Sequence, residues 1–115
     1  MSADPASIPM GLRDPSVLVG RLTTLGRRTG LSRIVEINLI YLHGKFYATT
    51  ASVKNKHWCL NMIKNPAVEV EAGKRRLRCR SYLVTDEKLR IRVLQLRDSP
   101  PLLGRAVFEM SPFHE

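Results

Sequence analysis

The segment spanning residues 22–33 reads Leu-Thr-Thr-Leu-Gly-Arg-Arg-Thr-Gly-Leu-Ser-Arg, and the rest of the chain is organised around it. An apolar, β-branched run ends at Gly26, and a long apolar strand begins soon after Gly30. Glycine permits positive φ and close backbone approach, while a guanidinium group binds oxyanions through two parallel hydrogen bonds. Three arginines, a hydroxyl and backbone N–H groups therefore form the parts of a phosphate or carboxylate cradle. A basic, solvated hairpin loop explains the same residues, and the chemistry alone leaves both interpretations open.

Length, composition and charge limit what the chain can be. Its 115 residues, 43% hydrophobic and 25% charged, are typical of a single globular domain. The net charge of +9 predicts an anionic partner: nucleic acid, an anionic membrane surface, or a small molecule with phosphates and carboxylates. No apolar run is long enough to span a membrane, and the N-terminus lacks a signal-peptide pattern, so we expect a cytoplasmic location.

Cysteine and histidine give no sign of a disulfide framework or a metal site. Cys59 and Cys79 form no closely spaced pair, and we expect both thiols in the apolar core. The histidines, His43, His57 and His114, lie far apart in the sequence and lack the spacing of metal ligands. We therefore expect no bound metal.

Hydrophobic periodicity predicts six strands and two helices, in the order β, β, β, α, β, β, α, β. The predicted strands span residues 17–25, 34–42, 45–50, 67–72, 75–84 and 105–110, and the predicted helices span 56–64 and 86–97. We expect Ser52 or Asn55 to cap the first helix and Thr85 the second. Residues 1–16, with three prolines, are predicted to form a flexible arm, and residues 17–115 the folded domain.

Two glycine-containing turns, His43-Gly44 and Gly73-Lys74, predict antiparallel hairpins. The second turn sets a register with two pairs of opposite charge, Glu69 with Arg78 and Glu71 with Arg76. Apolar residues then share the other face, and a slip of one residue would exchange the faces. Because two arginines have acidic neighbours, a solvated sheet face explains residues 74–80 better than a nucleic-acid patch does.

The predicted strand over residues 34–42 has two unlike faces. Its odd positions are all apolar and belong to a core. Its even positions mix polar residues with Ile34, Ile40 and Leu42, which exceed the needs of one core face. We therefore predict that the even face forms the interface of a homodimer. Six twisted antiparallel strands with two helices outside indicate an α+β fold, a small antiparallel split β-barrel with two flanking helices.

Two ordered motifs resemble a known family. The first is Leu-Thr-Thr-Leu-Gly-Arg-Arg-Thr-Gly at residues 22–30, followed by Arg33. The second comprises Lys-Asn-Lys-His-Trp-Cys-Leu-Asn at 54–61 and Asn-Pro-Ala-Val-Glu-Val at 65–70. Both resemble the deazaflavin-dependent nitroreductases, flavin- and deazaflavin-binding split β-barrels related to pyridoxamine-phosphate-oxidase-like proteins. The resemblance implies a homodimeric oxidoreductase that binds the deazaflavin coenzyme F420, or alternatively FMN, and passes hydride to a nitro compound, a quinone or a similar small acceptor.

The resemblance also implies a set of cofactor-binding residues. Those at the phosphate and the oligoglutamate tail are Arg27, Arg28, Thr29, Gly30 and Arg33. Those beside the deazaflavin ring are Thr49, Thr50, Ala51 and Ser52, and those on the following loop and helix start are Lys54, Asn55 and Trp58. The sequence departs from the family at Ser32, where members commonly have proline, and in the loop after Thr50, which is shorter and lacks paired glycines. The shorter loop leaves the choice between deazaflavin and FMN open.

No Ser/His/Asp or Cys/His constellation indicates a protein nucleophile, so the catalytic residues stay unknown and the cofactor supplies the chemistry. Tyr47 and His57 are candidate proton donors, although core packing or surface placement explains each of them as well. A non-catalytic cofactor carrier on the same barrel is one alternative. A basic nucleic-acid-binding barrel is another, but only Phe46 and Tyr47 offer stacking surfaces, and they lie on opposite faces of one strand. We therefore expect no nucleic-acid partner.

Overall fold

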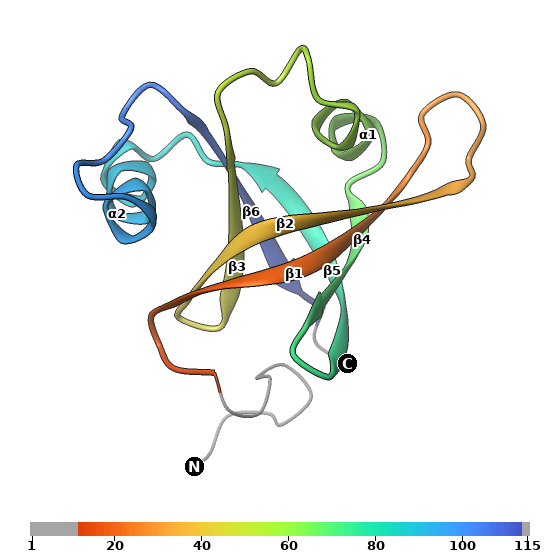
Figure 1. Cartoon of the computed structure of the whole chain (residues 1–115). Coiled ribbons are helices and arrows are strands. Elements are labelled where there is room, and N and C mark those ends of the chain that lie inside the picture. The colour runs from red at the N-terminus through yellow and green to blue at the C-terminus, as the bar shows by residue number, and fades with distance from the viewer. Residues whose placement is uncertain (1–11, 114–115) are drawn as a thin grey trace.

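The computed structural model describes residues 12–113 and shows a closed six-stranded barrel with two helices packed on it (Figure 1). The elements are β1 (Ser16–Leu25), β2 (Ser32–Leu42), β3 (Lys45–Thr50), α1 (His57–Lys64), β4 (Ala67–Ala72), β5 (Arg75–Leu83), α2 (Glu87–Arg97) and β6 (Ala106–Pro112). Neighbouring strands are antiparallel, in the order β1-β2-β3-β6-β5-β4 around the barrel. The predicted α+β barrel, its element order and its two helices are confirmed. The predicted arm over residues 1–16 lies outside the described residues except for 12–16.

Both predicted hairpins form, and the second has the predicted register. His43 has φ 52° and Gly44 has φ 80°, the two positive values that a type I′ turn requires. Gly73 has φ 62°, which suits the first turn position of a type II′ hairpin. The two predicted pairs of opposite charge lie side by side, Glu69 opposite Arg78 and Glu71 opposite Arg76.

Glu71 has a further basic neighbour that no local pattern contains. β1 also pairs with β4, and this closure of the barrel places Arg21 beside Glu71. The distance from Arg21 Nη1 to Glu71 Oε1 is 3.9 Å, whereas Arg76 makes no salt bridge with any residue in 12–113. The outer wall therefore carries alternating charges across four adjacent strands, from Glu36 on β2 to Arg76 on β5.

Strand alternation separates two apolar layers. Inward-facing side chains, among them Phe46 and Phe108, fill the barrel. Ile40 and Leu42 face outward and lie in a second layer, beneath α2. The prediction that these two residues form a dimer interface is therefore wrong, because a helix of the same chain covers them. Ile34, on the same face of β2, is 67% exposed.

The helix caps differ from the prediction. α1 begins after Lys56, which makes no side-chain cap, so neither Ser52 nor Asn55 caps it. α2 begins after Asp86, whose carboxylate accepts a hydrogen bond of 3.0 Å from the main-chain N–H two residues later. Asp86 rather than Thr85 is therefore the cap. Within residues 12–113, neither helix is long and apolar enough to cross a membrane.

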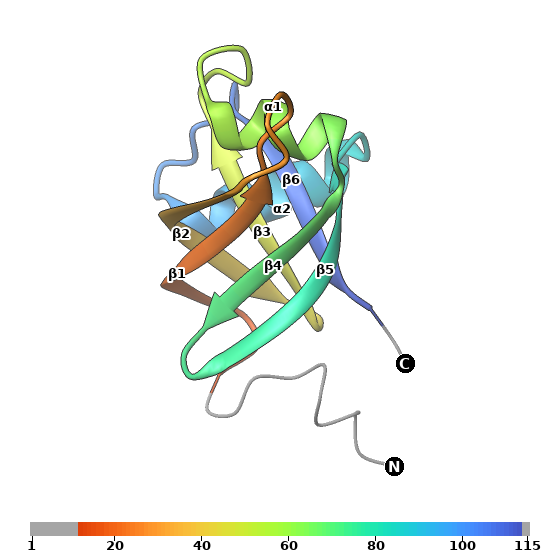
Figure 2. The same cartoon turned by 90° about the vertical axis from the view of Figure 1, so that its right-hand side faces the viewer.

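The barrel is closed, but the seam between β2 and β3 is short. β2 pairs with β3 only through Ile40, Tyr41 and Leu42, so residues 32–39 have no described strand on that edge. α1 and the connection that leads into it lie at this end of the barrel, next to the loop between β1 and β2 (Figures 1 and 2). The β2–β3 and β4–β5 turns lie at the opposite end (Figure 1). The β1–β2 loop and α1 therefore meet at the same end of the barrel (Figures 1 and 2).

Candidate functional site

A pocket of about 690 Å³ lies between the β1–β2 loop and α1. Its rim is basic on both sides, with Arg27, Arg28 and Arg33 from the β1–β2 hairpin and Lys56 and His57 from the start of α1. Its barrel side is apolar, because Val35 and Trp58 line it and also pack against the core inside the barrel. Within residues 12–113, no carboxylate lines the pocket. The pocket thus joins a cationic surface to an apolar one.

The β1–β2 loop is closed by its own hydrogen bonds. The Gly26 N–H donates to the Leu31 carbonyl at 2.8 Å, and the Gly30 N–H donates to the Gly26 carbonyl at 2.8 Å. The Leu31 N–H donates to Thr29 Oγ1 at 3.2 Å. Gly30 has φ 72°, in the region that favours glycine. These N–H groups are already engaged, so the predicted free backbone donors are not available at Gly26, Gly30 and Leu31.

Asn61 joins this loop to α1. It is 3% exposed, and its Oδ1 accepts hydrogen bonds from the Arg27 N–H at 3.2 Å and from Arg27 Nη1 at 3.0 Å. Its Nδ2 donates to Thr24 Oγ1 at 3.2 Å. On the solvent side, His57 Nδ1 lies 3.5 Å from Arg27 Nη1. The Arg27 guanidinium is therefore held against α1.

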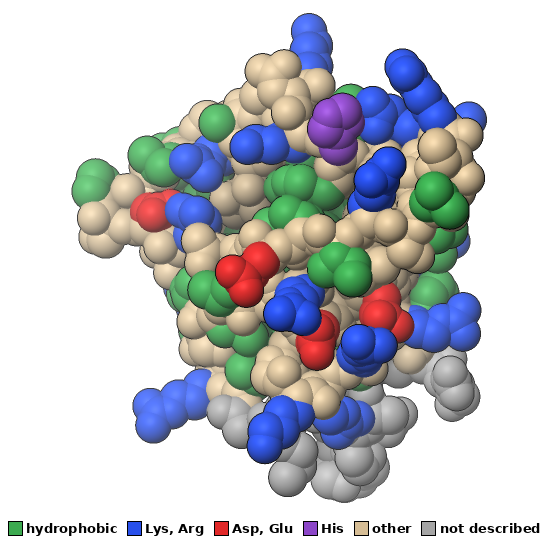
Figure 3. Space-filling model, turned by 45° about the vertical axis from the view of Figure 1, so that its right-hand side comes forward, with side chains coloured by type: hydrophobic (Ala, Val, Ile, Leu, Met, Phe, Trp, Pro, Cys, Tyr) green, Lys and Arg blue, Asp and Glu red, His purple; other side chains and the backbone are tan. Residues whose placement is uncertain are grey.

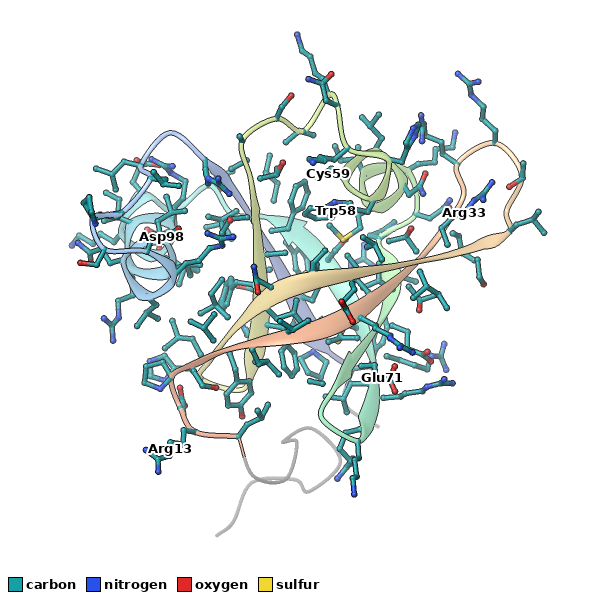
Figure 4. The ribbon with its side chains drawn as sticks, viewed as in Figure 1. Arg13, Arg33, Trp58, Cys59, Glu71 and Asp98 are labelled. Carbon is teal, nitrogen blue, oxygen red and sulfur yellow. The ribbon has the colours of Figure 1, made fainter. Side chains whose placement is uncertain are left out.

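Arg28 and Arg33, which with Arg27 we term the loop arginines, are exposed. Arg33 lies opposite Thr24 in the β1–β2 pair, so both side chains project from the same face of the hairpin. In Figure 4, Arg33 lies on the arm of the hairpin that extends past the barrel, and Trp58 lies below α1. Within residues 12–113, no loop arginine forms a salt bridge, so their positive charges are available to a ligand.

The segment predicted to lie beside the ring is divided between two sides of the barrel wall. Thr50 is buried and faces the barrel interior. Thr49 faces the other side, as does Tyr47 beneath α2. Neither threonine lines the pocket, and Ala51 and Ser52 do not line it either.

The remaining predicted cofactor-binding residues also fall into two groups, those that line the pocket and those that do not. Asn55 and Trp58 line the pocket, whereas Gly30 and Lys54 do not. Trp58 is half-buried and packs edge-on against Phe108, with ring centroids 6.1 Å apart and ring planes at 65°. The members of the predicted set that meet at the pocket are Arg27, Arg28, Thr29, Arg33, Asn55 and Trp58.

The two candidate proton donors lie in different environments. Tyr47 is 3% exposed, and its hydroxyl donates to Glu109 Oε1 at 3.3 Å. Burial, and then the charge of Glu109, raise the pKa of Tyr47 far above its usual value, and Tyr47 does not line the pocket. His57 is exposed and lines the pocket beside Arg27. Of the two, only His57 is placed to contact a ligand there.

The two rings on which the nucleic-acid alternative rested, Phe46 and Tyr47, are not at the surface. Phe46 is fully buried inside the barrel, where its ring centroid lies 5.2 Å from that of Tyr41. Tyr47 is buried on the outer side of the wall beneath α2. Neither ring can stack on a base without unfolding the barrel wall.

Both cysteines are free and buried, as predicted. Burial raises the pKa of Cys59 to about 11 and that of Cys79 to about 12. Because the thiolate is the reactive form, neither thiol is a nucleophile near neutral pH. Neither cysteine lines the pocket.

Sequence reasoning alone misses Asn61 as a functional residue. The signal is its position, because Asn61 lies between Cys59 and Met62 on the buried side of α1. A buried amide needs hydrogen-bond partners, so an asparagine at such a position indicates polar groups across from it. Thr24 and Val35 are missed for another reason. Strand alternation places them on the inner face, but it does not say that a pocket opens there.

Several solved structures share the fold. An F420-H2 dependent reductase matches with a TM-score of 0.61 over 81% of this chain and 93% of that one, at 23% identity. A putative pyridoxamine 5′-phosphate oxidase from Listeria innocua matches with a TM-score of 0.67 over 84% of each chain, at 19% identity. A structure described as a domain-swapped dimer matches with a TM-score of 0.62 over 81% of this chain and 79% of that one, at 21% identity. At these identities the likeness establishes the barrel fold.

The sequence comparisons identify the family. A search of curated proteins finds no match to the chain. The model of the F420H2-dependent quinone reductase family matches residues 7–102, which is most of the chain. The predicted dependence on a deazaflavin is confirmed, and the family is named for quinones rather than nitro compounds. The chain belongs to the F420H2-dependent quinone reductase family and is a deazaflavin-dependent oxidoreductase.

Proposed function

We propose that the chain is a cytoplasmic reductase whose pocket holds the deazaflavin cofactor with its anionic part against the loop arginines and its ring against Val35 and Trp58. Its acceptor is a quinone. The observation that carries the proposal is the lining of the pocket: the loop arginines meet there and, within residues 12–113, no carboxylate joins them. A cofactor with a phosphate and a carboxylate tail requires a lining of this kind.

The pocket fits this cofactor in charge and in size. A guanidinium group pairs with phosphate or carboxylate through two hydrogen bonds, and three such groups face the pocket. The volume of about 690 Å³ lies within the roughly 300–1,000 Å³ of most small-molecule sites. Gly30, Lys54 and residues 49–52 do not line the pocket, so the proposal does not include them.

The reduced deazaflavin, when bound, supplies the hydride for the acceptor. The chain itself binds the cofactor, orients it and shields it from water. Trp58, packed against Phe108, forms a supported apolar wall. A quinone that accepts hydride also takes up a proton, which solvent supplies.

Fluorescence titration with F420 and with FMN tests the choice of cofactor. We expect F420 to bind more tightly, because its tail adds carboxylates for Arg28 and Arg33 to the single phosphate that FMN offers. The Arg28→Ala variant should therefore weaken the binding of F420 more than that of FMN. Tighter binding of FMN to the wild type would contradict the proposal.

The acceptor is tested by following the reoxidation of reduced F420. We expect a higher kcat/KM with a water-soluble naphthoquinone than with a nitroaromatic compound, because the family is named for quinone reduction. A preference for the nitroaromatic compound would instead support the narrower resemblance to nitroreductases. Tight F420 binding without turnover of either compound would favour the cofactor-carrier alternative.

We also propose that the chain forms a homodimer through the outer face of β1 and β2. Val17, Val19 and Ile34 lie on this face and are 47%, 59% and 67% exposed. A second copy that covers them would remove an apolar surface from water. The solved structure described as a domain-swapped dimer supports association in this fold.

Light scattering tests this assembly. The wild type should have the mass of a dimer at micromolar concentration, and Val19→Glu should give monomers. Tyr82→Glu changes an exposed residue of β5, away from this face, and should leave the dimer intact. A monomeric wild type would refute the proposal.

A further inference from the structure

We infer that Asn61 is a positioning residue, which fixes Arg27 for anion binding before any cofactor arrives. The inference rests on the proposed function, because it takes the loop side of the pocket to receive the anionic part of the cofactor. It gives Asn61, a residue of α1, a role in binding that is exerted through Arg27 rather than by contact with the ligand. Figure 2 shows the two elements concerned, the β1–β2 loop and α1, side by side at one end of the barrel.

Asn61 connects segments that are distant in sequence. Arg27 lies 34 positions from it and Thr24 lies 37 positions from it. Oδ1 of Asn61 accepts from both the main-chain N–H and Nη1 of Arg27, while Nδ2 donates to the Thr24 hydroxyl. Asn61 is 3% exposed and Thr24 is 1% exposed, so water has little access to replace these bonds.

The amide of Asn61 satisfies all of these neighbours. Arg27 offers donors alone, whereas the Thr24 hydroxyl accepts, and an asparagine presents an acceptor to the first and a donor to the second. An amide turned around would set its NH₂ group against the guanidinium donors. Aspartate in place of Asn61 would still accept from Arg27, but it would lose the donor and bring a negative charge to the pocket.

The link has two consequences for binding. It removes rotamer freedom from Arg27 in the free protein, so less entropy is lost when an anion binds. It also engages Nη1 and leaves the other guanidinium N–H groups for the ligand. Arg28 and Arg33 make no such side-chain bond within residues 12–113, so the ligand itself must order them. The site therefore combines one preformed anchor with two adaptable cations.

Nitrogen–proton correlation spectra of the arginine side chains test the inference without any cofactor. A held guanidinium rotates slowly and gives separate Nη signals, which the Arg27→Lys variant assigns by their loss. We expect separate Arg27 signals in the wild type and averaged signals in Asn61→Ala. The control Gln95→Ala removes an exposed amide on α2 and should keep them separate. Averaged Arg27 signals in the wild type would overturn the inference.

Fluorescence titration with F420 then measures the effect on binding. We expect Asn61→Ala to weaken the affinity by about tenfold or more, as expected when a charged group loses its hydrogen-bond partner, and Gln95→Ala to leave it unchanged. Asn61→Asp should keep the Arg27 signals separate and still bind F420 more weakly, because the new carboxylate compensates the guanidinium charge. This second variant also keeps the test valid if Asn61→Ala does not fold. Wild-type affinity in both variants would overturn the inference.

Failure of the inference and failure of the proposed function give different results. A wild type that binds no F420 contradicts the proposed function, and the Arg27 signals, recorded without cofactor, then still confirm or overturn the link to Asn61. A wild type that binds F420, together with an Asn61→Ala variant that binds it equally well, overturns only the positioning role.

Discussion

Two parts of the molecule are rich in arginine, yet they differ in what lies opposite the guanidinium groups. The loop arginines are Arg27, Arg28 and Arg33, and the strand arginines, on the outer face of β5, are Arg76, Arg78 and Arg80. The loop arginines face a pocket that contains no carboxylate within residues 12–113. The strand arginines lie beside β4, whose outward positions carry glutamates. Arginine content alone therefore does not distinguish a binding site from a solvated sheet face.

The strand arginines have acidic or aromatic side chains as neighbours, although none of them forms a salt bridge within residues 12–113. Cross-strand pairing sets glutamates opposite Arg76 and Arg78. The guanidinium of Arg78 also lies 6.0 Å from the centroid of the Phe113 ring, and that of Arg80 lies 5.9 Å from the Tyr82 ring. In Figure 3, red acidic and blue basic side chains alternate in the lower middle of this face, whereas its upper right is blue. The register of the sheet, rather than the number of arginines, decides which charges are available.

The largest expected effect separates the two sets directly. Arg27→Ala should weaken F420 binding by about 1–3 kcal/mol, the scale of a lost charge-assisted hydrogen bond. Arg78→Ala, which removes the same side chain from β5, should leave the affinity unchanged. Fluorescence titration of both variants measures this difference. Equal losses in the two variants would mean that net charge, rather than the pocket, attracts the cofactor.

The buried thiols beneath the two arginine-rich regions should make the free energy of unfolding fall at alkaline pH. Cys59 is a buried residue of α1, and Cys79 is a buried residue of β5 that lies between Arg78 and Arg80 in the sequence. Burial raises the pKa of Cys59 from 9.0 to about 11 and that of Cys79 from 9.0 to about 12. The folded pKa exceeds the unfolded one, so the unfolded state loses its protons first as pH rises. The free energy of unfolding is then highest below pH 9 and should fall by roughly 1–3 kcal/mol as pH rises through the folded values.

Urea unfolding at about pH 8 and about pH 11 checks this dependence. Cys79→Ala should reduce the slope more than Cys59→Ala, because the pKa of Cys79 is raised further. A free energy of unfolding that does not change over this range would contradict the burial of both thiols.

Salt should weaken F420 binding several-fold, because the Debye length falls from about 10 Å at 0.1 M to about 3 Å at 1 M. The exposed Arg28 should contribute to this dependence, so Arg28→Ala should show a shallower slope of affinity against salt concentration. Arg76→Ala should show the same slope of affinity against salt concentration as the wild type. Titrations at several salt concentrations give the slopes, and parallel lines for all three proteins would return the loop to the status of a solvated basic turn.

The smallest effect concerns the charge ladder of the outer wall. Glu71→Gln should lower the free energy of unfolding by at most about 0.5 kcal/mol, because the Arg21–Glu71 pair spans 3.9 Å and the Arg21 side chain is 60% exposed. The variant should bind F420 like the wild type. Tighter binding would show that a strand arginine, once it lacks its acidic neighbour, also attracts the cofactor. Urea unfolding and fluorescence titration give the two measurements.

The sequence by itself determined the local structure of this protein. The hairpin turns follow from glycines that tolerate positive φ, at Gly44 and Gly73, and the strand registers follow from the match of apolar and charged faces. The basic loop was likewise readable, because the motif over residues 22–33 is contiguous. All of these features depend on residues a few positions apart, or on pairs that a short turn brings into line.

Only the tertiary structure decided what surrounds those elements. The bond between Asn61 and Arg27, and the closure of β1 on β4 beside Glu71, join residues dozens of positions apart. α2 covers Ile40 and Leu42, which the strand pattern alone presents as surplus apolar surface. Such contacts depend on how twisted elements pack, and the alternation along one strand specifies a face without specifying what will cover it. The arginines of the site are therefore visible in the sequence, whereas the pocket that gives them an anionic ligand exists only once α1 packs beside the loop.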